Sequence, residues 1–331
     1  MHALLAGFFS TVGDTEALDV VRGWLDEEGV TYDVAAYSDP VRQALEALDP
    51  RDVEATRYTH LIVICGPYHR ETYRRIGFDL DRFSSCVRIG VNLEIIDDDD
   101  SEQPFDVLLE RGSSRMVRPD ITFLRPVERL PVVGVVLAPA QDEYGGRQRH
   151  SLADDLVVDA LAGMEVAPLR LDTRWPVSRN VSFIDSAEAY ESVCSRVDAI
   201  VTTRLHGMVL ALKNGVPVVA IDPIAGGDKV SRQAKQVHWP VLLAEAVTVD
   251  EVRSAVRGAL TSECQKRARA AAIRATGELA SLSESFLAAL SVSPKGLPAR
   301  TQPYPESPRF VRTLHGINAR LRRAARALMG R

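Results

Sequence analysis

The residues with the clearest chemical potential lie at 201–222, VTTRLHGMVLALKNGVPVVAID, where polar side chains separate two apolar runs. Arg204 offers a planar guanidinium that pairs with a carboxylate or phosphate. His206 offers an imidazole, the side chain suited to moving a proton near neutral pH. Gly207 lets a ligand approach the backbone closely. Together they indicate an anion that undergoes proton-linked chemistry. The alternative is that Arg204 and His206 only cap the helix and pair with a nearby acid.

The local pattern places these residues where ligands collect in α/β proteins. Residues 198–203 (DAIVTT) are an apolar run typical of a strand buried on both faces, and residues 206–214 predict a short helix. Arg204 and His206 therefore lie between the carboxyl end of a strand and the first turn of a helix. The unpaired N–H groups and the dipole of a helix start favour an anion there.

A second loop of similar character follows the next strand. The stretch 222–237, DPIAGGDKVSRQAKQV, leaves that strand through Gly226 and Gly227 and brings Lys229 to the first turn of another helix. A glycine pair before a helix is a weak phosphate-loop signal by itself. Arg204 and Lys229 each follow one of two neighbouring strands, so the two signals support each other. We expect both side chains to face one anionic ligand.

Two further loops carry candidate binding residues. In EYGGRQRH (143–150), Arg147 and Arg149 are candidates for the same anion site, and the alternative is that both are solvated. Near the N-terminus, Gly13 and Asp14 precede a helix. Asp14 is a candidate ligand for sugar hydroxyls, and the alternative is a helix N-cap.

The run IIDDDD (95–100) ends a predicted strand with four acids. An Asp-rich segment in this position holds a divalent cation in metal-dependent glycosyltransferases, but we favour a solvated acidic loop. We expect no metal and no cofactor. The other histidines that we considered (His2, His60, His69, His238 and His315) have no ligand spacing, so we assign them no role.

The elements needed to position these residues can be identified from periodicity. Apolar runs alternate with helical patterns in the first half, and the pattern restarts after 125–131. This alternation predicts an α/β fold of two consecutive doubly wound, Rossmann-like domains with parallel sheets. In the first half we predict strands at 2–9, 32–37, 60–65, 87–96 and 120–124 and a helix at 15–28, and the second half opens with a strand at 131–139 and a helix at 151–162.

Four segments follow from this pattern: an N-terminal domain (1–129), a C-terminal domain (130–290), a linker with five prolines (291–308) and a basic amphipathic helix (309–331). The last segment contains seven arginines and no acid. We favour a surface helix that packs back on the acidic body. The alternative is peripheral contact with an anionic membrane, near a lipid-linked substrate.

Composition excludes several classes of protein. The 331 residues carry a net charge of −5, which argues against a nucleic-acid binder. The four cysteines are widely spaced, as is typical of a reducing compartment. No apolar run approaches the roughly 20 residues of a membrane span. We therefore expect a cytoplasmic protein, with the inner face of the membrane as the alternative location.

The segment Thr202-Thr203-Arg204-Leu205-His206-Gly207, followed by Ala211, Gly215-Val216-Pro217 and Lys229, resembles the polysaccharide pyruvyl transferase family. The residues 10–18, STVGDTEAL, and the segment 110–120, ERGSSRMVRPD, are similar to further family segments. The resemblance covers roughly residues 3–245. It implies a two-domain GT-B-like arrangement with the acceptor on the N-terminal side and the donor on the C-terminal side.

The resemblance also implies a reaction. The pyruvyl group of phosphoenolpyruvate, the donor substrate, would pass to two hydroxyls of a saccharide or lipid-linked saccharide, giving a cyclic ketal and phosphate. His206 would donate the proton or activate the hydroxyl, Arg204 would hold the carboxylate or phosphate, and Lys229 would neutralise the leaving phosphate. Thr203 and Gly207, as part of the motif, and Gly226 and Gly227 are expected at the donor site.

Two alternatives remain open at this level. A metal-independent GT-B-type glycosyltransferase or a sugar-nucleotide epimerase would use the same loops to hold a nucleotide diphosphate. A non-catalytic saccharide-binding protein would keep the same site without turnover. Stabilisation by a UDP-sugar rather than by phosphoenolpyruvate would favour the first alternative, and an activity unchanged by His206→Ala would favour the second.

Overall fold

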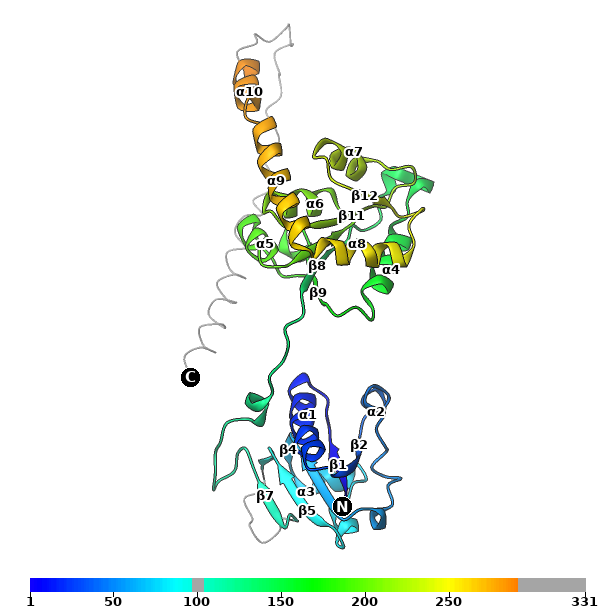
Figure 1. Cartoon of the computed structure of the whole chain (residues 1–331), viewed down its shortest axis with the longest axis vertical. Helices are drawn as coiled ribbons and strands as arrows, with labels where there is room; N and C mark the ends of the chain where they lie inside the picture. Colours follow the sequence, from blue (N-terminus) through cyan, green and yellow to red (C-terminus); the bar gives the residue numbers. More distant parts are fainter. Residues whose placement is uncertain (97–103, 291–331) are drawn as a thin grey trace, which may run out of the picture. The chain divides into compact units, whose positions relative to one another are not determined.

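The computed structural model describes residues 1–96 and 104–290. The predicted linker (291–308), the predicted basic helix (309–331) and the four acids at 97–100 lie outside the described residues. The chain divides into two compact units, Met1–Arg129 and Leu130–Arg331. Each unit contains its own parallel sheet (Figure 1).

Unit 1 (Met1–Arg129) has five strands in the order β2-β1-β3-β5-β7, with every neighbouring pair parallel. Its strands are β1 (His2–Gly7), β2 (Thr31–Ala36), β3 (His60–Ile64), β5 (Val87–Val91) and β7 (Val107–Leu109). Its α-helices are α1 (Val12–Glu27), α2 (Asp39–Leu45) and α3 (Arg70–Arg75). A separate two-stranded sheet pairs β4 (Pro67–Tyr68) with β6 (Glu94–Ile95).

Unit 2 (Leu130–Arg331) has a second parallel sheet in the order β12-β11-β10-β8-β9. Its strands are β8 (Val132–Val136), β9 (Ala167–Arg170), β10 (Ala199–Thr202), β11 (Val218–Asp222) and β12 (Val241–Leu243). Its α-helices are α4 (His150–Leu161), α5 (Ala187–Cys194), α6 (Leu205–Lys213), α7 (Lys229–Gln236), α8 (Val249–Ala259), α9 (Ser262–Glu278) and α10 (Leu282–Leu290). Both sheets are parallel and flanked by helices, so the predicted α/β class with two consecutive Rossmann-like units is confirmed.

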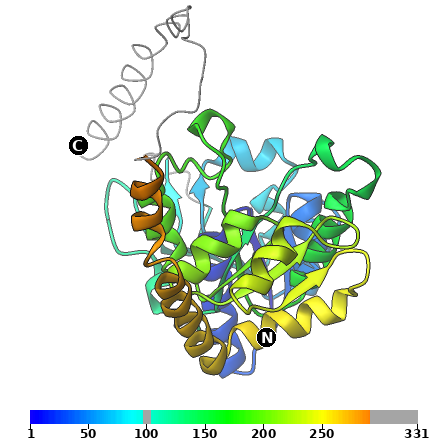
Figure 2. The ribbon, with the colours of Figure 1, turned by 90° about the horizontal axis from the view of Figure 1, so that it is seen from above.

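Helices cover both faces of the unit 2 sheet. One core packs α4 and α8 on the sheet, and the other packs α5, α6, α7 and α9 on the opposite face. The two helices α4 and α8 lie beside each other (Figure 1), and α8 leads directly into α9 (Figure 2). Ile200 and Val201, neighbours in β10, belong to different cores. Such alternation is expected of a strand buried on both faces, and it explains the uninterrupted apolar run in the sequence.

The strand order creates a ligand-binding edge in unit 2. The first strand, β8, lies between β9 and β10. The chain leaves β8 toward α4 on one face of the sheet and leaves β10 toward α6 on the other face. Connections that diverge from adjacent parallel strands define a topological switch point, and ligands bind outside the carboxyl ends of such strands. Arg204 and His206 lie at this point.

Two local predictions are wrong. Residues 120–124 were predicted as a strand, but η4 (Ile121–Leu124) is a short 3-10 helix. Asp120 caps it, because its carboxylate accepts a hydrogen bond from the Thr122 N–H at 3.0 Å. The predicted strand 87–96 ends at Val91, since Asn92 adopts a left-handed backbone (φ 55°) that breaks the pairing before β6.

Two general properties of the chain bear on its environment. All four cysteines are free thiols. Within residues 1–96 and 104–290, every helix is too short or too polar to cross a membrane.

Candidate active site

The turn between β10 and α6 is held by two buried threonines. The Thr202 hydroxyl donates to the Val136 carbonyl of β8 at 2.7 Å and accepts the Arg204 N–H at 3.0 Å. The Thr203 hydroxyl accepts the Ala138 N–H at 2.7 Å. These bonds tie the end of β10 to the loop after β8 and fix where Arg204 emerges. Thr203, predicted as a donor-site residue, therefore has its hydroxyl bound within the protein.

Arg204 is the N-cap residue of α6, and its side chain is 22% exposed. Its guanidinium Nη1 donates to Oδ1 of Asp172 at 3.3 Å. Asp172 follows β9 and its side chain is only 5% exposed. Because β9 and β10 flank β8, the carboxyl edge of the sheet brings these two residues together. Arg204 is thus partly paired with an acid, as one of the alternatives anticipated, and it remains partly exposed at the switch point.

Asp172 is a shared anchor for two arginines. Arg174 donates to Asp172 Oδ2 from Nε at 2.8 Å and from Nη2 at 2.6 Å. Burial by itself would raise the pKa of Asp172, but the hydrogen bonds from Arg174 outweigh it and hold the pKa below its ordinary value. The carboxylate therefore stays charged and keeps the Arg204 guanidinium in place.

His206 lies in the first turn of α6 and is exposed. Among the described residues, none is within hydrogen-bond or ion-pair distance of its ring. The imidazole is therefore free to meet a substrate. The first N–H groups of the same helix lack intrahelical acceptors, which adds a positive end beside this ring.

The structure gives a packing reason for glycine at position 207 that the sequence did not reveal. It is buried, and a Cβ atom there would lie 2.2 Å from Thr202 Oγ1 and 3.1 Å from Val136 Cγ1. The glycine lets the start of α6 pack directly on β10 and β8. Close contact of the helix with the sheet requires glycine here, and contact of Gly207 with a ligand stays a prediction.

The second predicted loop is organised by Asp222, the last residue of β11. Its buried carboxylate accepts the Asp228 N–H at 2.7 Å, and the Ser231 N–H and hydroxyl at 2.9 and 2.7 Å. Gly226 and Gly227 adopt left-handed backbones (φ 76° and 75°), which glycine tolerates without strain. This geometry places Lys229 as the first residue of α7.

Lys229 and Arg147 make different contacts at the loop between β11 and α7. The Lys229 ammonium is 5.5 Å from the centre of the Tyr144 ring. The Arg147 guanidinium donates to the carbonyls of Ala225 (3.0 Å) and Gly227 (3.1 Å), so it fastens the glycine loop. Arg149 donates to the carbonyls of Gly146 and Gln148 within its own loop. The Arg147 guanidinium therefore contacts the loop that carries Gly226, Gly227 and Lys229, whereas Arg149 contacts that loop only through its backbone N–H, which donates to the Pro223 carbonyl at 2.7 Å.

The N-terminal candidates form a helix cap. Thr11 is the N-cap of α1: its hydroxyl accepts the Asp14 N–H at 3.2 Å, while Asp14 accepts the Thr11 N–H at 3.1 Å. The helix consequently begins at Val12, three residues before the predicted start, and Asp14 is its third residue rather than its cap. Gly13 is exposed at the same helix start. Binding of a saccharide by Gly13 and Asp14 stays a prediction.

Sequence reasoning missed Asp172, Asp222 and His150. Asp222 ends a strand and Asp172 follows one. A polar residue at the end of a strand is the same signal that identified Arg204. His150 begins α4, is 5% exposed, and neither ring nitrogen has a partner among the described residues. Burial and the nearby Lys229 charge lower the pKa of His150, so the ring is neutral at physiological pH.

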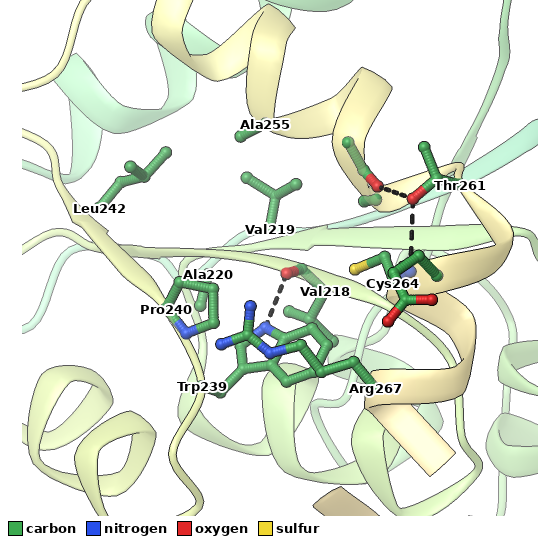
Figure 3. A pocket seen from close by; sticks show the side chains of 13 residues that line it. Val218, Val219, Ala220, Trp239, Pro240, Leu242, Ala255, Thr261, Cys264 and Arg267 are labelled. Carbon is green, nitrogen blue, oxygen red and sulfur yellow. Dashed lines mark hydrogen bonds between the residues drawn. The ribbon is translucent and has the colours of Figure 1, made fainter. Parts of the chain in front are cut away.

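One cavity of unit 2 lies away from the carboxyl edge of its sheet. A cavity of about 330 Å³ beside Trp239, Cys264 and Arg267 is lined by the start of β11 and by the end of α8, at the amino edge of the sheet (Figure 3). Within residues 1–96 and 104–290, no cluster of three His, Cys, Asp or Glu side chains could hold a metal ion.

Comparison with known proteins bears on this site directly. Residues 98–223 match the polysaccharide pyruvyl transferase family. The resemblance found in the sequence is thereby confirmed over that segment, and it implies a transferase acting on a saccharide. The match includes Arg204, His206, Gly207 and Asp172 but stops before Lys229. No curated protein matches the chain.

Solved structures resemble the chain only distantly. They include the spinosyn rhamnosyltransferase SpnG (TM-score 0.35, 12% identity, 88% of this chain and 100% of that chain). Others are MurG of Acinetobacter baumannii (0.31, 13%, 86% and 99%) and the E. coli heptosyltransferase WaaC with ADP (0.26, 13%, 78% and 99%). At these TM-scores they add nothing on function, and the fold assignment rests on the two sheets themselves.

Proposed function

We propose that the chain transfers the pyruvyl group of phosphoenolpyruvate to two hydroxyls of a cell-surface saccharide or its precursor, forming a cyclic ketal and releasing phosphate. One observation carries the proposal: the segment that matches the pyruvyl transferase family contains Arg204 and His206, and these residues occupy the switch point of unit 2. Phosphoenolpyruvate is the only donor that the proposal requires, with no resident cofactor.

The donor carries a carboxylate and a phosphate a few ångströms apart, so it needs two cationic contacts. Arg204 and the start of α6 supply one, at the end of β10. Lys229, the first residue of α7, supplies the other at the end of the adjacent strand β11. Asp172 positions Arg204, while Asp222 and Arg147 hold the loop that carries Lys229.

The reaction can be written with all protons placed. Protonation of the donor's methylene carbon gives a cation at C2, which the first saccharide hydroxyl attacks. The C2–O bond to phosphate then breaks, and the second hydroxyl attacks C2 to close the ketal. One hydroxyl proton is balanced by the proton gained at the methyl carbon, and the other leaves with phosphate. His206, exposed and free of partners among the described residues, is assigned the proton transfers.

Magnitudes follow from the type of contact. A preorganised charge on the reacting group contributes about 3 kcal/mol to the transition state. A general acid or base contributes roughly 10²–10⁴ in rate. Removing the His206 imidazole should therefore act mainly on kcat.

The test measures phosphate released from phosphoenolpyruvate in the presence of a panel of cell-envelope saccharides, with the ketal identified by mass spectrometry. His206→Asn should lower kcat by at least about 100-fold. His238→Asn is the matched control, because His238 is an exposed histidine of the same unit at the opposite edge of the sheet. Turnover of a UDP-sugar without phosphoenolpyruvate, or equal rates for His206→Asn and the control, would overturn the proposal.

A further inference from the structure

A cavity of about 210 Å³ lies beside the proposed reaction site in unit 2. Its walls come from the loop between β9 and α5, from α5 itself and from α6, and they include Asp172, Arg174, Trp175, Ile184, Tyr190 and Leu210. Asp172 and Arg174 also belong to the arginine-anchoring contacts at the end of β9.

Two contacts connect the cavity to the switch point. Asp172, in its wall, accepts the hydrogen bond from Arg204. Leu210, also in its wall, lies four residues after His206 in α6, so the two side chains share one face of the helix a turn apart. A ligand in this cavity would therefore extend along α6 toward His206.

The two charged side chains in the wall itself, Asp172 and Arg174, offset each other. Arg174 directs Nε and Nη2 at Asp172, and Asp172 also receives Arg204. An additional dianion such as phosphoenolpyruvate would find little unpaired positive charge here. The remaining lining is largely carbon with a few hydroxyl and amide groups, which suits a neutral ring that carries hydroxyls.

One aromatic side chain gives the cavity a surface on which a ring can stack. Trp175 is 73% exposed, which is unusual for so large an apolar ring and leaves an indole face available at the rim. Tyr190 is buried and its ring adds to the apolar wall, while its hydroxyl oxygen is closed to solvent and therefore lies out of a ligand's reach.

We infer that this cavity binds one pyranose ring of the saccharide acceptor, with the ring's C–H face on the indole of Trp175. The inference rests on the proposed function, which it deepens by locating an acceptor subsite in unit 2. The size agrees, since a cavity of about 150 Å³ accommodates benzene, and 210 Å³ has room for one substituted six-membered ring.

The first test compares Trp175→Ala with Phe183→Ala. Phe183 is 87% exposed on the same loop but does not line the cavity, so it is the matched control. We expect Trp175→Ala to raise the KM for the acceptor roughly 3- to 10-fold, as befits loss of one stacked ring. The KM for phosphoenolpyruvate and the thermal midpoint should stay at wild-type values. An unchanged acceptor KM, in an enzyme that still releases phosphate, overturns the inference and leaves the proposed function standing.

The second test does not depend on turnover. Saturation-transfer NMR with the methyl pyranosides of glucose, galactose, mannose and N-acetylglucosamine should show contact with at least one ring in wild type and in Phe183→Ala. Trp175→Ala should lose that signal. Binding of a pyranoside without any phosphoenolpyruvate turnover would refute the proposed function alone. Equal signals in all variants, or displacement of the sugar by phosphoenolpyruvate, would refute the subsite.

Discussion

Replacing Asp172 by asparagine tests whether the paired arginines organise the site. The Asp172 side chain is 5% exposed and bonds Arg174 and Arg204 at 2.6 and 3.3 Å. Asp172→Asn keeps the shape but removes the charge, and its amide nitrogen faces guanidinium groups that can only donate. The variant therefore leaves two partly exposed arginines without their buried acid.

The expected size of the effect follows from burial. Breaking a fully buried ion pair costs about 3–5 kcal/mol. The side chains of Arg174 and Arg204 are 34% and 22% exposed, so solvent weakens these pairs and we expect about 1.5–3 kcal/mol. For a domain of 150–250 residues, 1 kcal/mol shifts Tm by about 2–4 °C, so we expect a decrease of roughly 3–12 °C. A hydrogen bond between charged groups contributes about 1.5–3 kcal/mol. Loss of the one that positions Arg204 should raise the KM for phosphoenolpyruvate by about tenfold or more.

The effect should also depend on pH in a defined direction. The folded pKa of Asp172 is below its ordinary value of about 3.9. The stabilisation is therefore fully present above the unfolded pKa and is lost as the pH falls through the folded pKa. The gap in Tm between wild type and Asp172→Asn should be constant from about pH 7 to 5 and shrink below about pH 4.

Thermal melts and phosphate-release kinetics provide the readouts. Glu191→Gln is the control, since Glu191 pairs with the exposed Lys213 at 2.7 Å, a surface interaction worth about 0–1 kcal/mol. If Asp172→Asn matched Glu191→Gln in Tm and in KM, the anchoring role assigned to Asp172 would be wrong.

Two further predictions concern the packing of unit 2. Gly207→Ala places a Cβ atom 2.2 Å from Thr202 Oγ1, so we expect a loss of about 1–3 kcal/mol in denaturant unfolding and a lower kcat as the start of α6 shifts; a variant as stable and active as wild type would refute the close packing. His150 is buried with a lowered pKa near Lys229, Asp222 and Glu143, so its contribution to stability falls as the pH drops below about 6.5. His150→Leu should therefore flatten the stability profile between about pH 7 and 5, and a profile parallel to that of wild type would contradict the assignment.

The strands and helices around the site follow from local pattern. Residues 198–203 read as a doubly buried strand because every residue of β10 is buried, and this left little ambiguity. The prediction of a strand at 120–124 is wrong for a physical reason. Phe123 and Leu124 are 85% and 63% exposed in a 3-10 turn, so their apolar character does not mark a core strand.

Contacts made across the sheet could not be predicted from one sequence. Asp172 lies 32 residues before Arg204 and meets it only because β9 and β10 both flank β8. The sequence predicts a ligand contact at Gly207, and the structure adds a packing requirement, because Thr202 leaves no room for a side chain. The sequence predicts that Arg147 binds an anion, and the structure adds that its guanidinium bonds two carbonyls of the glycine loop. In each case the sequence identifies the residue but does not identify the groups that it contacts.

Calorimetric titration of phosphoenolpyruvate into wild type, Arg204→Ala and Arg257→Ala tests whether Arg204 binds the donor. Arg257 is an exposed arginine of α8 and serves as the control. We expect saturable binding to wild type and to Arg257→Ala, and an affinity at least about tenfold weaker for Arg204→Ala. Equal affinity for all three proteins, or no binding to wild type, would contradict this expectation.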